Sequence, residues 1–190
     1  MRTAIFGGTF NPVHLGHLAL AEEVVNIGYQ RIIFIPAKWS SHGAKDGYIA
    51  AMDRREMLSL ALASIPWAVL WDGELARTGP SYSIDSVDEL RKNGMITEKP
   101  GFIIGDDLME DFPSWKEADR LAESTTIIIG QRNKRKNVPF RYPCIPLGNP
   151  IQPYSSTQVR AFIAKRYSLE TILPQSVITY IQDKKLYGYQ

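Results

Sequence analysis

Residues 7–17 read Gly-Gly-Thr-Phe-Asn-Pro-Val-His-Leu-Gly-His and follow directly on the apolar run Thr3-Ala4-Ile5-Phe6. This order predicts a buried strand, a glycine turn and a helix that begins near His14. Glycine lets the backbone approach an anion closely, and the first turn of a helix offers free N–H groups at its positive end. His14 and His17, three positions apart, project from one face of that helix. The segment therefore predicts a phosphate site in an enzyme that acts on nucleotides.

The segment matches neither of the common phosphate-binding glycine motifs. No Gly-Lys-Ser/Thr follows Gly7-Gly8, and the Gly-x-Gly-x-x-Gly spacing of dinucleotide-binding folds is absent. The groups that meet the phosphates must therefore be the histidines and residues from elsewhere in the chain. The alternative is a helix with two incidental histidines, which fits less well because two of the chain's three histidines lie beside the glycine pair.

Composition sets only broad bounds. The 190 residues suit one domain, and a formal net charge of +2 is too small to indicate nucleic acid or an acidic membrane as a partner. The basic stretch 132–136 leaves RNA binding open beside the reading as a solvated loop. No apolar run reaches the roughly 18 residues that span a bilayer. The single Cys144 excludes a disulfide framework and favours a reducing compartment, so we expect a cytoplasmic protein.

Short apolar runs alternate with amphipathic stretches along the chain. Runs such as Ile32-Ile33-Phe34-Ile35 are continuously apolar, as in parallel strands covered on both faces. The alternation predicts a Rossmann-like α/β fold, a doubly wound parallel sheet with helices on both faces and a small C-terminal helical part. We expect a single domain over residues 1–190, with the segment of about 154–190 packed on it. The predicted strands are 3–6, 31–35, 68–71, 101–104, 125–129 and 144–147, and the predicted helices are 14–27, 52–64, 84–93, 114–123, 156–165 and 175–183.

Residues 7–17 resemble the HxGH motif of the nucleotidyltransferase superfamily, whose members attach a nucleoside monophosphate from ATP or CTP to a phosphate. The resemblance implies that His14 and His17 contact the nucleotide phosphates and that His17 stabilises the pentavalent transition state. Many members have Asp where this chain has Asn11.

Residues 155–160, Ser-Ser-Thr-Gln-Val-Arg, are similar to the superfamily's ISSTxIR element, with Tyr154 where isoleucine is usual. Its hydroxyls would cap a helix, and Arg160 would return to the same end one turn later, where a guanidinium matches phosphate oxygens. Alone, the element would be an ordinary helix start. Beside the histidine segment it predicts the opposite wall of one phosphate site, with His14, His17 and Arg160 as the catalytic set.

Three further segments are similar to bacterial nicotinate-nucleotide adenylyltransferases. Residues 74–87 resemble their ELxRxGPSYTIDTL segment, and residues 102–115 match FIIGxDxL…LPxW. Residues 173–187 look like the closing LPxxVxxYIxxxxLY helix, so the resemblance runs from about residue 2 to 188. It implies transfer of the adenylyl group of ATP to nicotinate mononucleotide, with Mg²⁺ brought by ATP and no metal site of the protein's own.

The resemblance also assigns binding residues. Trp115 would stack on the pyridine ring, and Ser83 with main-chain amides of helices starting near 84 and 115 would hold its carboxylate. The implied ATP-binding residues are Gly7, Gly8, Thr9, Phe10, Gly105, Asp107, Arg132, Ser155, Ser156 and Thr157. The implied nicotinate mononucleotide-binding residues are Ser83, Trp115, Lys116, His42 and Lys45.

Several of these assignments have structural alternatives. Trp115 can be a core tryptophan, Asp107 a helix cap and Arg132 a solvated loop residue. The family's IPAxxPPHK pattern is interrupted here, so His42 and Lys45 can equally be surface residues, whereas Arg54 is read as surface or scaffold.

The expected partners are ATP and nicotinate mononucleotide, with neither nucleic acid nor membrane, and oligomeric state is left open. Two functional alternatives remain. One is a sibling transferase that uses nicotinamide mononucleotide or another phosphate acceptor, and the other is a non-catalytic nucleotide-binding protein.

Overall fold

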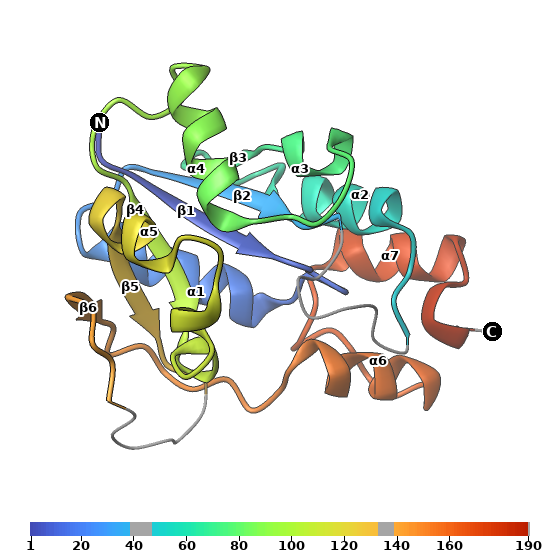
Figure 1. Cartoon of the computed structure of the whole chain (residues 1–190). Coiled ribbons are helices and arrows are strands. Elements are labelled where there is room, and N and C mark those ends of the chain that lie inside the picture. Colours follow the sequence, from blue (N-terminus) through green and yellow to red (C-terminus); the bar gives the residue numbers. More distant parts are fainter. Residues whose placement is uncertain (39–46, 133–138, 190) are drawn as a thin grey trace.

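The computed structural model describes residues 1–38, 47–132 and 139–189. Strands and helices alternate along most of the chain, and the C-terminal part is helical (Figure 1). The strands are β1 Thr3–Gly8, β2 Arg31–Pro36, β3 Ala68–Leu70, β4 Gly101–Gly105, β5 Thr126–Gly130 and β6 Cys144–Pro146. The helices are α1 Leu15–Asn26, α2 Ala51–Leu62, α3 Gly73–Ala76, α4 Ser83–Lys92, α5 Ala118–Ser124, α6 Ser156–Ala164 and α7 Gln175–Asp183, with 3₁₀ turns η1 Asp106–Leu108, η2 Phe112–Ser114 and η3 Leu186–Gly188.

The six strands form one parallel sheet in the order β3-β2-β1-β4-β5-β6. β1 pairs with β2 over its whole length, from Thr3 opposite Arg31 to Gly8 opposite Pro36, and with β4 on its other side. The chain order reverses between β1 and β4, which is where an open parallel sheet forms a crevice at its carboxyl ends. The predicted α/β class and doubly wound parallel sheet are confirmed.

Alternate residues of the strands face two separate cores. Ala4, Phe6, Ile32 and Phe34 pack with residues of α1, α2, α6 and α7 on one face. Ile5, Ile33 and their neighbours in β4 and β5 pack with residues of α4 and α5 on the other face. Because side chains alternate along a strand, a continuously apolar sequence is what a sheet covered on both faces requires.

The predicted helix over 114–123 is wrong in its first turn. The chain forms η2 before Trp115, Trp115 is extended (φ −69°, ψ 153°), and α5 begins only at Ala118 after the left-handed Glu117. Trp115 turns inward, with its ring 5.0 Å from that of Phe112, and this packing replaces a regular helical turn. The short α3 was not predicted.

α6 and α7 lie beyond the carboxyl end of β1 (Figure 1). α7 packs against α2, where the Tyr180 hydroxyl donates to Asp53 (2.8 Å) and the Ser176 hydroxyl donates to the carbonyl of Leu60 (3.3 Å). Across the described ranges, none of the helices has the length and hydropathy that would let it cross a membrane.

Candidate active site

A cavity of about 520 Å³ lies at the carboxyl ends of β1, β4 and β5, a size typical of small-molecule sites. Its walls come from the start of α1, the ends of β4 and β5, the segment before α6 and the first turn of α6. The lining residues are Phe6, His14, Gly16, His17, Leu20, Gly105, Asp107, Gln131, Arg132, Asn149, Gln152, Pro153, Tyr154, Ser155 and Gln158.

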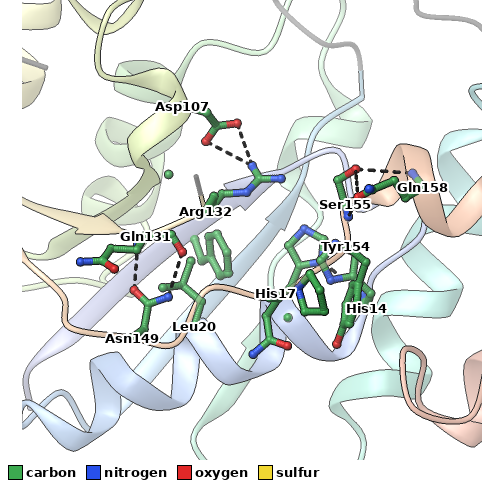
Figure 2. A pocket seen from close by; sticks show the side chains of 15 residues that line it. His14, His17, Leu20, Asp107, Gln131, Arg132, Asn149, Tyr154, Ser155 and Gln158 are labelled. Atoms are coloured by element: carbon green, nitrogen blue, oxygen red, sulfur yellow. Dashed lines mark hydrogen bonds and ion pairs between the residues drawn. The ribbon is translucent and has the colours of Figure 1, made fainter. Parts of the chain in front are cut away.

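The two histidines form a stacked pair in this cavity (Figure 2). Their ring centroids are 3.7 Å apart, and the rings are inclined by 30°. The main-chain N–H of His14 donates to Nδ1 of His17 (3.2 Å). An accepting Nδ1 in a neutral imidazole leaves the proton on Nε2, so His17 has a free N–H donor. His14 is only 4% exposed, and neither of its ring nitrogens has a hydrogen-bond partner among the described residues.

Burial and nearby charge favour the neutral form of both imidazoles. Burial, and secondly the charge of Arg132, lowers the pKa of His14 from 6.5 to about 3. Burial, then His14 and Arg132, lowers the pKa of His17 well below its usual value. An unpaired buried imidazole costs free energy unless a ligand satisfies it. The pair is therefore arranged to meet an anion that brings its own charge.

Gly16 lies in tight contact with the side chains of His14 and Gln152. A Cβ at this position would lie 3.0 Å from Nδ1 of His14 and 3.0 Å from the side chain of Gln152. The buried ring of Phe10 packs edge-on against the imidazole of His17, with 5.1 Å between the ring centroids. Gly7, Gly8, Thr9 and Phe10, which were expected to bind ATP, are not among the residues that line the cavity.

Arg132 is the cation of this cavity. Its guanidinium reaches Asp107 at 3.2 Å, and its main-chain N–H donates to Asp106 (3.0 Å). Gly105 makes the approach possible, because a Cβ there would lie 2.5 Å from Cδ of Arg132. Figure 2 shows Arg132 between Asp107 and the histidines. The structure thus brings Gly105, Asp107 and Arg132 together as expected.

The α6 wall also forms as expected at its first turn. The Ser155 hydroxyl accepts from the N–H of Gln158 (3.4 Å), and Gln158 Oε1 accepts from the N–H of Ser155 (2.8 Å), which makes a capping box. Arg160 does not line the cavity: its guanidinium donates to the carbonyl of Asn11 (2.9 Å) and to Thr157 (3.3 Å). Ser156 donates to the carbonyl of Pro12 (3.2 Å). The prediction that Arg160 faces the imidazoles across a gap is therefore not met in this conformation.

Sequence reasoning missed the wall formed by Gln131 and Asn149. The side-chain amide of Asn149 accepts from the main-chain N–H of Gln131 (2.8 Å) and donates to the main-chain carbonyl of Gln131 (2.9 Å). These are the two hydrogen bonds that a neighbouring strand would otherwise make with Gln131. This contact joins residues 18 positions apart through one side-chain amide, so no local sequence pattern could have predicted it.

Of the residues predicted to bind nicotinate mononucleotide, Ser83, Trp115 and Lys116 do not line this cavity. Ser83 is the first residue of α4, and Lys116 donates to the carboxylate of Asp85 on the same helix (2.8 Å). Trp115 packs on Phe112, and its N–H donates to the Phe112 carbonyl (3.0 Å), so this amide is engaged within the protein. The expectation that main-chain amides near 115 hold the pyridine carboxylate stays a prediction. His42 and Lys45 lie outside the described residues.

A buried polar network fixes the segment that leads into α4. Glu74 of α3 is 6% exposed and accepts from the hydroxyl of Ser86, while Arg77 donates to Ser86 (3.1 Å) and to Glu89 (2.6 Å). Burial raises the pKa of Glu74 against the opposing hydrogen bond from Ser86. The network explains why glutamate, arginine and the residues of α4 occur together in residues 74–87.

Arg54 of α2 ties two strand ends together. It is 2% exposed, and its guanidinium donates to the carbonyls of Thr9 (2.6 Å), Ala37 (2.8 Å) and Lys38 (3.1 Å). The expected scaffold role for Arg54 matches these contacts.

Comparison with known proteins gives a consistent result. A family model described as "Cytidylyltransferase-like" matches residues 5–162. A "Probable nicotinate-nucleotide adenylyltransferase" of Borreliella afzelii (strain PKo) is 34% identical over 188 residues, covering 98% of this chain and 97% of the relative. One of the same description from Listeria monocytogenes serotype 4a (strain HCC23) is 35% identical over 193 residues, with 98% and 97% covered.

Solved structures share the fold. The Plasmodium falciparum nicotinic acid mononucleotide adenylyltransferase complexed with NaAD superimposes with a TM-score of 0.79 at 21% identity, covering 100% of this chain and 98% of that one. The same protein complexed with APC gives a TM-score of 0.74 at 21% identity, with 100% and 98% covered. Taken with the histidine pair and the relatives matched over nearly their whole length, these findings show that the chain belongs to the cytidylyltransferase-like family and, within it, to the nicotinate-nucleotide adenylyltransferases.

Proposed function

We propose that the protein transfers the adenylyl group of ATP to nicotinate mononucleotide, releasing pyrophosphate and forming nicotinate adenine dinucleotide for NAD biosynthesis. The family supports this activity, and one structural observation carries it to this chain: His14 is buried in the cavity with both ring nitrogens unpaired, stacked on His17. Buried polar atoms of this kind require a partner, and a phosphate chain supplies acceptor oxygens.

The chemistry proposed is a direct displacement. An oxygen of the nicotinate mononucleotide phosphate attacks the α-phosphorus of ATP, and the bond from that phosphorus to the bridging oxygen breaks as pyrophosphate leaves. The attacking phosphate is already ionised at pH 7, so no general base is needed and the protein contributes positioning and charge stabilisation. His17 donates through Nε2 to the oxygens where charge develops, and His14 orients the phosphates.

Arg132, Arg160 and Mg²⁺ are proposed to neutralise the charge of the substrate phosphates. Arg132, which lines the cavity, holds phosphate or ribose oxygens together with the first turn of α6. Arg160 reaches the triphosphate by leaving the carbonyl of Asn11. Mg²⁺ enters as the ATP complex, because Asp107, a carboxylate that lines the cavity, is paired with Arg132 and does not by itself provide the several oxygen ligands that Mg²⁺ needs. Within the described residues, no group of three or more His, Cys, Asp or Glu could hold a metal ion.

The acceptor is proposed to lie toward the start of α4, with Ser83 and Trp115 on the pyridine ring. We place the reaction in the cytoplasm, since Cys144 is a free, exposed thiol of a kind that persists in reducing compartments.

The test is an ATP-dependent pyrophosphate assay run in parallel with nicotinate mononucleotide and nicotinamide mononucleotide. Faster release with the nicotinate nucleotide supports the proposal, and preference for the amide identifies a sibling activity. Calorimetric binding of ATP with no pyrophosphate from any acceptor would instead indicate a nucleotide-binding protein.

A further inference from the structure

The loop that connects β1 to α1 carries the histidines, and distant side chains hold its shape. Residues 9–14 have no regular structure, and Phe10 is left-handed at φ 45°. The carbonyls of Thr9, Asn11 and Pro12 accept from Arg54, Arg160 and Ser156. The position of His14 relative to the phosphates therefore depends on side chains from α2 and α6.

A fourth contact comes from the last turn of the chain. The hydroxyl of Tyr187 donates to Oδ1 of Asn11 (2.8 Å) across 176 positions of sequence. Asn11 is 1% exposed, and its Nδ2 donates to the carbonyl of Gly47 (3.1 Å), which fixes which end of the amide faces Tyr187. Burial raises the pKa of Tyr187 strongly, so its hydroxyl stays protonated and acts as the donor.

Two residues of this turn adopt left-handed backbone conformations, Lys185 directly after the end of α7 and Tyr187 at the contact itself. Lys185 (φ 50°, ψ 40°) and Tyr187 (φ 57°, ψ 28°) both adopt left-handed conformations that non-glycine residues rarely take. The turn directs the Tyr187 side chain back onto the β1–α1 loop, whereas Tyr189, two residues later, accepts from Gln182 of α7 (2.9 Å). Strain that persists in a fold is expected to serve a function or a contact that outweighs it.

We infer that Tyr187 is a positioning residue of the transferase, which acts through Asn11 to hold the loop that carries His14 in its working geometry. This inference rests on the proposed function. Tyr187 does not line the cavity, so its contribution is to the arrangement of other groups and not to contact with substrate.

The experiment compares Tyr187→Phe with Tyr189→Phe, a matched change in the same turn. Tyr187→Phe is expected to lower kcat about five- to tenfold, the effect of one lost buried hydrogen bond on the reacting geometry, with little change in KM for the pyridine nucleotide. Tyr189→Phe is expected to leave kcat unchanged. A Tyr187→Phe enzyme with the kcat of Tyr189→Phe overturns the inference.

A second comparison tests the route through Asn11. In an Asn11→Leu background, which lacks the acceptor, Tyr187→Phe should cause no further loss of kcat, because coupled residues are not additive. Losses that simply multiply would show that Tyr187 acts elsewhere.

A readout without turnover separates this inference from the proposed function. The chain has three histidines, so their imidazole NMR signals can be assigned by single substitutions. Tyr187→Phe should shift the signals of His14 and His17, and Tyr189→Phe should not. If the wild-type chain released no pyrophosphate, the proposed function would fail, yet unchanged imidazole signals alone would overturn the role of Tyr187.

Discussion

The histidine end of the molecule and the region at the start of α4 differ in how their titratable side chains are paired. At the histidine end, His14 keeps two unpaired ring nitrogens, and burial, with the nearby cation Arg132 as a smaller cause, lowers the pKa of both imidazoles. Around α4, Lys116 pairs with Asp85, and Arg77 pairs with Glu89. The first region is incomplete without a ligand, and the second is internally neutralised. Under the proposed function, the histidines are in place for phosphate before ATP binds, whereas the pyridine nucleotide meets aromatic and neutral groups.

The largest expected effect is at the histidine end. His17→Ala removes the donor at Nε2 and should cost on the order of 3 kcal/mol of transition-state stabilisation, as for the loss of an oxyanion donor. Pyrophosphate release should fall roughly a hundredfold in kcat/KM. Melting temperature serves as the folding control. Near-normal pyrophosphate release by a folded His17→Ala enzyme would show that the His17 imidazole takes no part in the reaction. The histidine end would then not differ from the α4 region in the way described above.

The second prediction concerns stability against pH. The folded-state pKa of His14 lies at about 3, below its ordinary 6.5, so the unfolded chain binds more protons between these values. The contribution of neutral His14 is complete above pH 6.5 and is lost as pH falls toward 3. At pH 5 the loss from His14 amounts to about 2 kcal/mol of unfolding free energy.

Urea unfolding at pH 7 and pH 5 measures this loss. His14→Asn, which does not titrate, should lose less stability than wild type over the same interval. A His14→Asn variant that loses stability as steeply as wild type would show that His14 is not the buried neutral group. Bound ATP should reduce the wild-type loss, because phosphate charge favours the protonated imidazole.

These two regions also differ in how far the sequence predicted them. The sheet and both histidines could be predicted because the apolar runs are continuous and the glycine, histidine and helix signals are local. The ion pair of Lys116 with Asp85 and the extended Trp115 could not, since they depend on where α5 and α4 meet in space. Likewise, the position of Arg160 one turn into α6 predicted that it would face the phosphates. In the structure its guanidinium instead donates to the carbonyl of Asn11, which lies 149 positions away in the sequence and so could not be predicted from local signals.

A third prediction tests whether Trp115, near the start of α4, contacts the pyridine ring. Trp115→Ala should raise KM for nicotinate mononucleotide about tenfold, the scale of a lost aromatic stacking contact, with a smaller change in kcat. Trp115 also packs on Phe112 and Phe102, so Trp115→Phe, which keeps an aromatic ring, provides the comparison. A lower melting temperature with an unchanged KM would mean that Trp115 serves the core only.

The smallest effect is expected at Lys116. Its ammonium lies 2.8 Å from Asp85 and 5.0 Å from the ring centre of Tyr82, so it is engaged within the protein. Exposed ion pairs contribute little, so Lys116→Met should change KM for nicotinate mononucleotide no more than about twofold, and Asp85→Asn should act similarly. Steady-state kinetics at low and high salt measure both. A tenfold rise in KM with Lys116→Met alone would mean that Lys116 leaves Asp85 and binds nicotinate mononucleotide, as the sequence resemblance implied. The α4 region would then differ from the histidine end, where the His14 imidazole is already unpaired, because the charge of Lys116 would become available only when the ligand arrives.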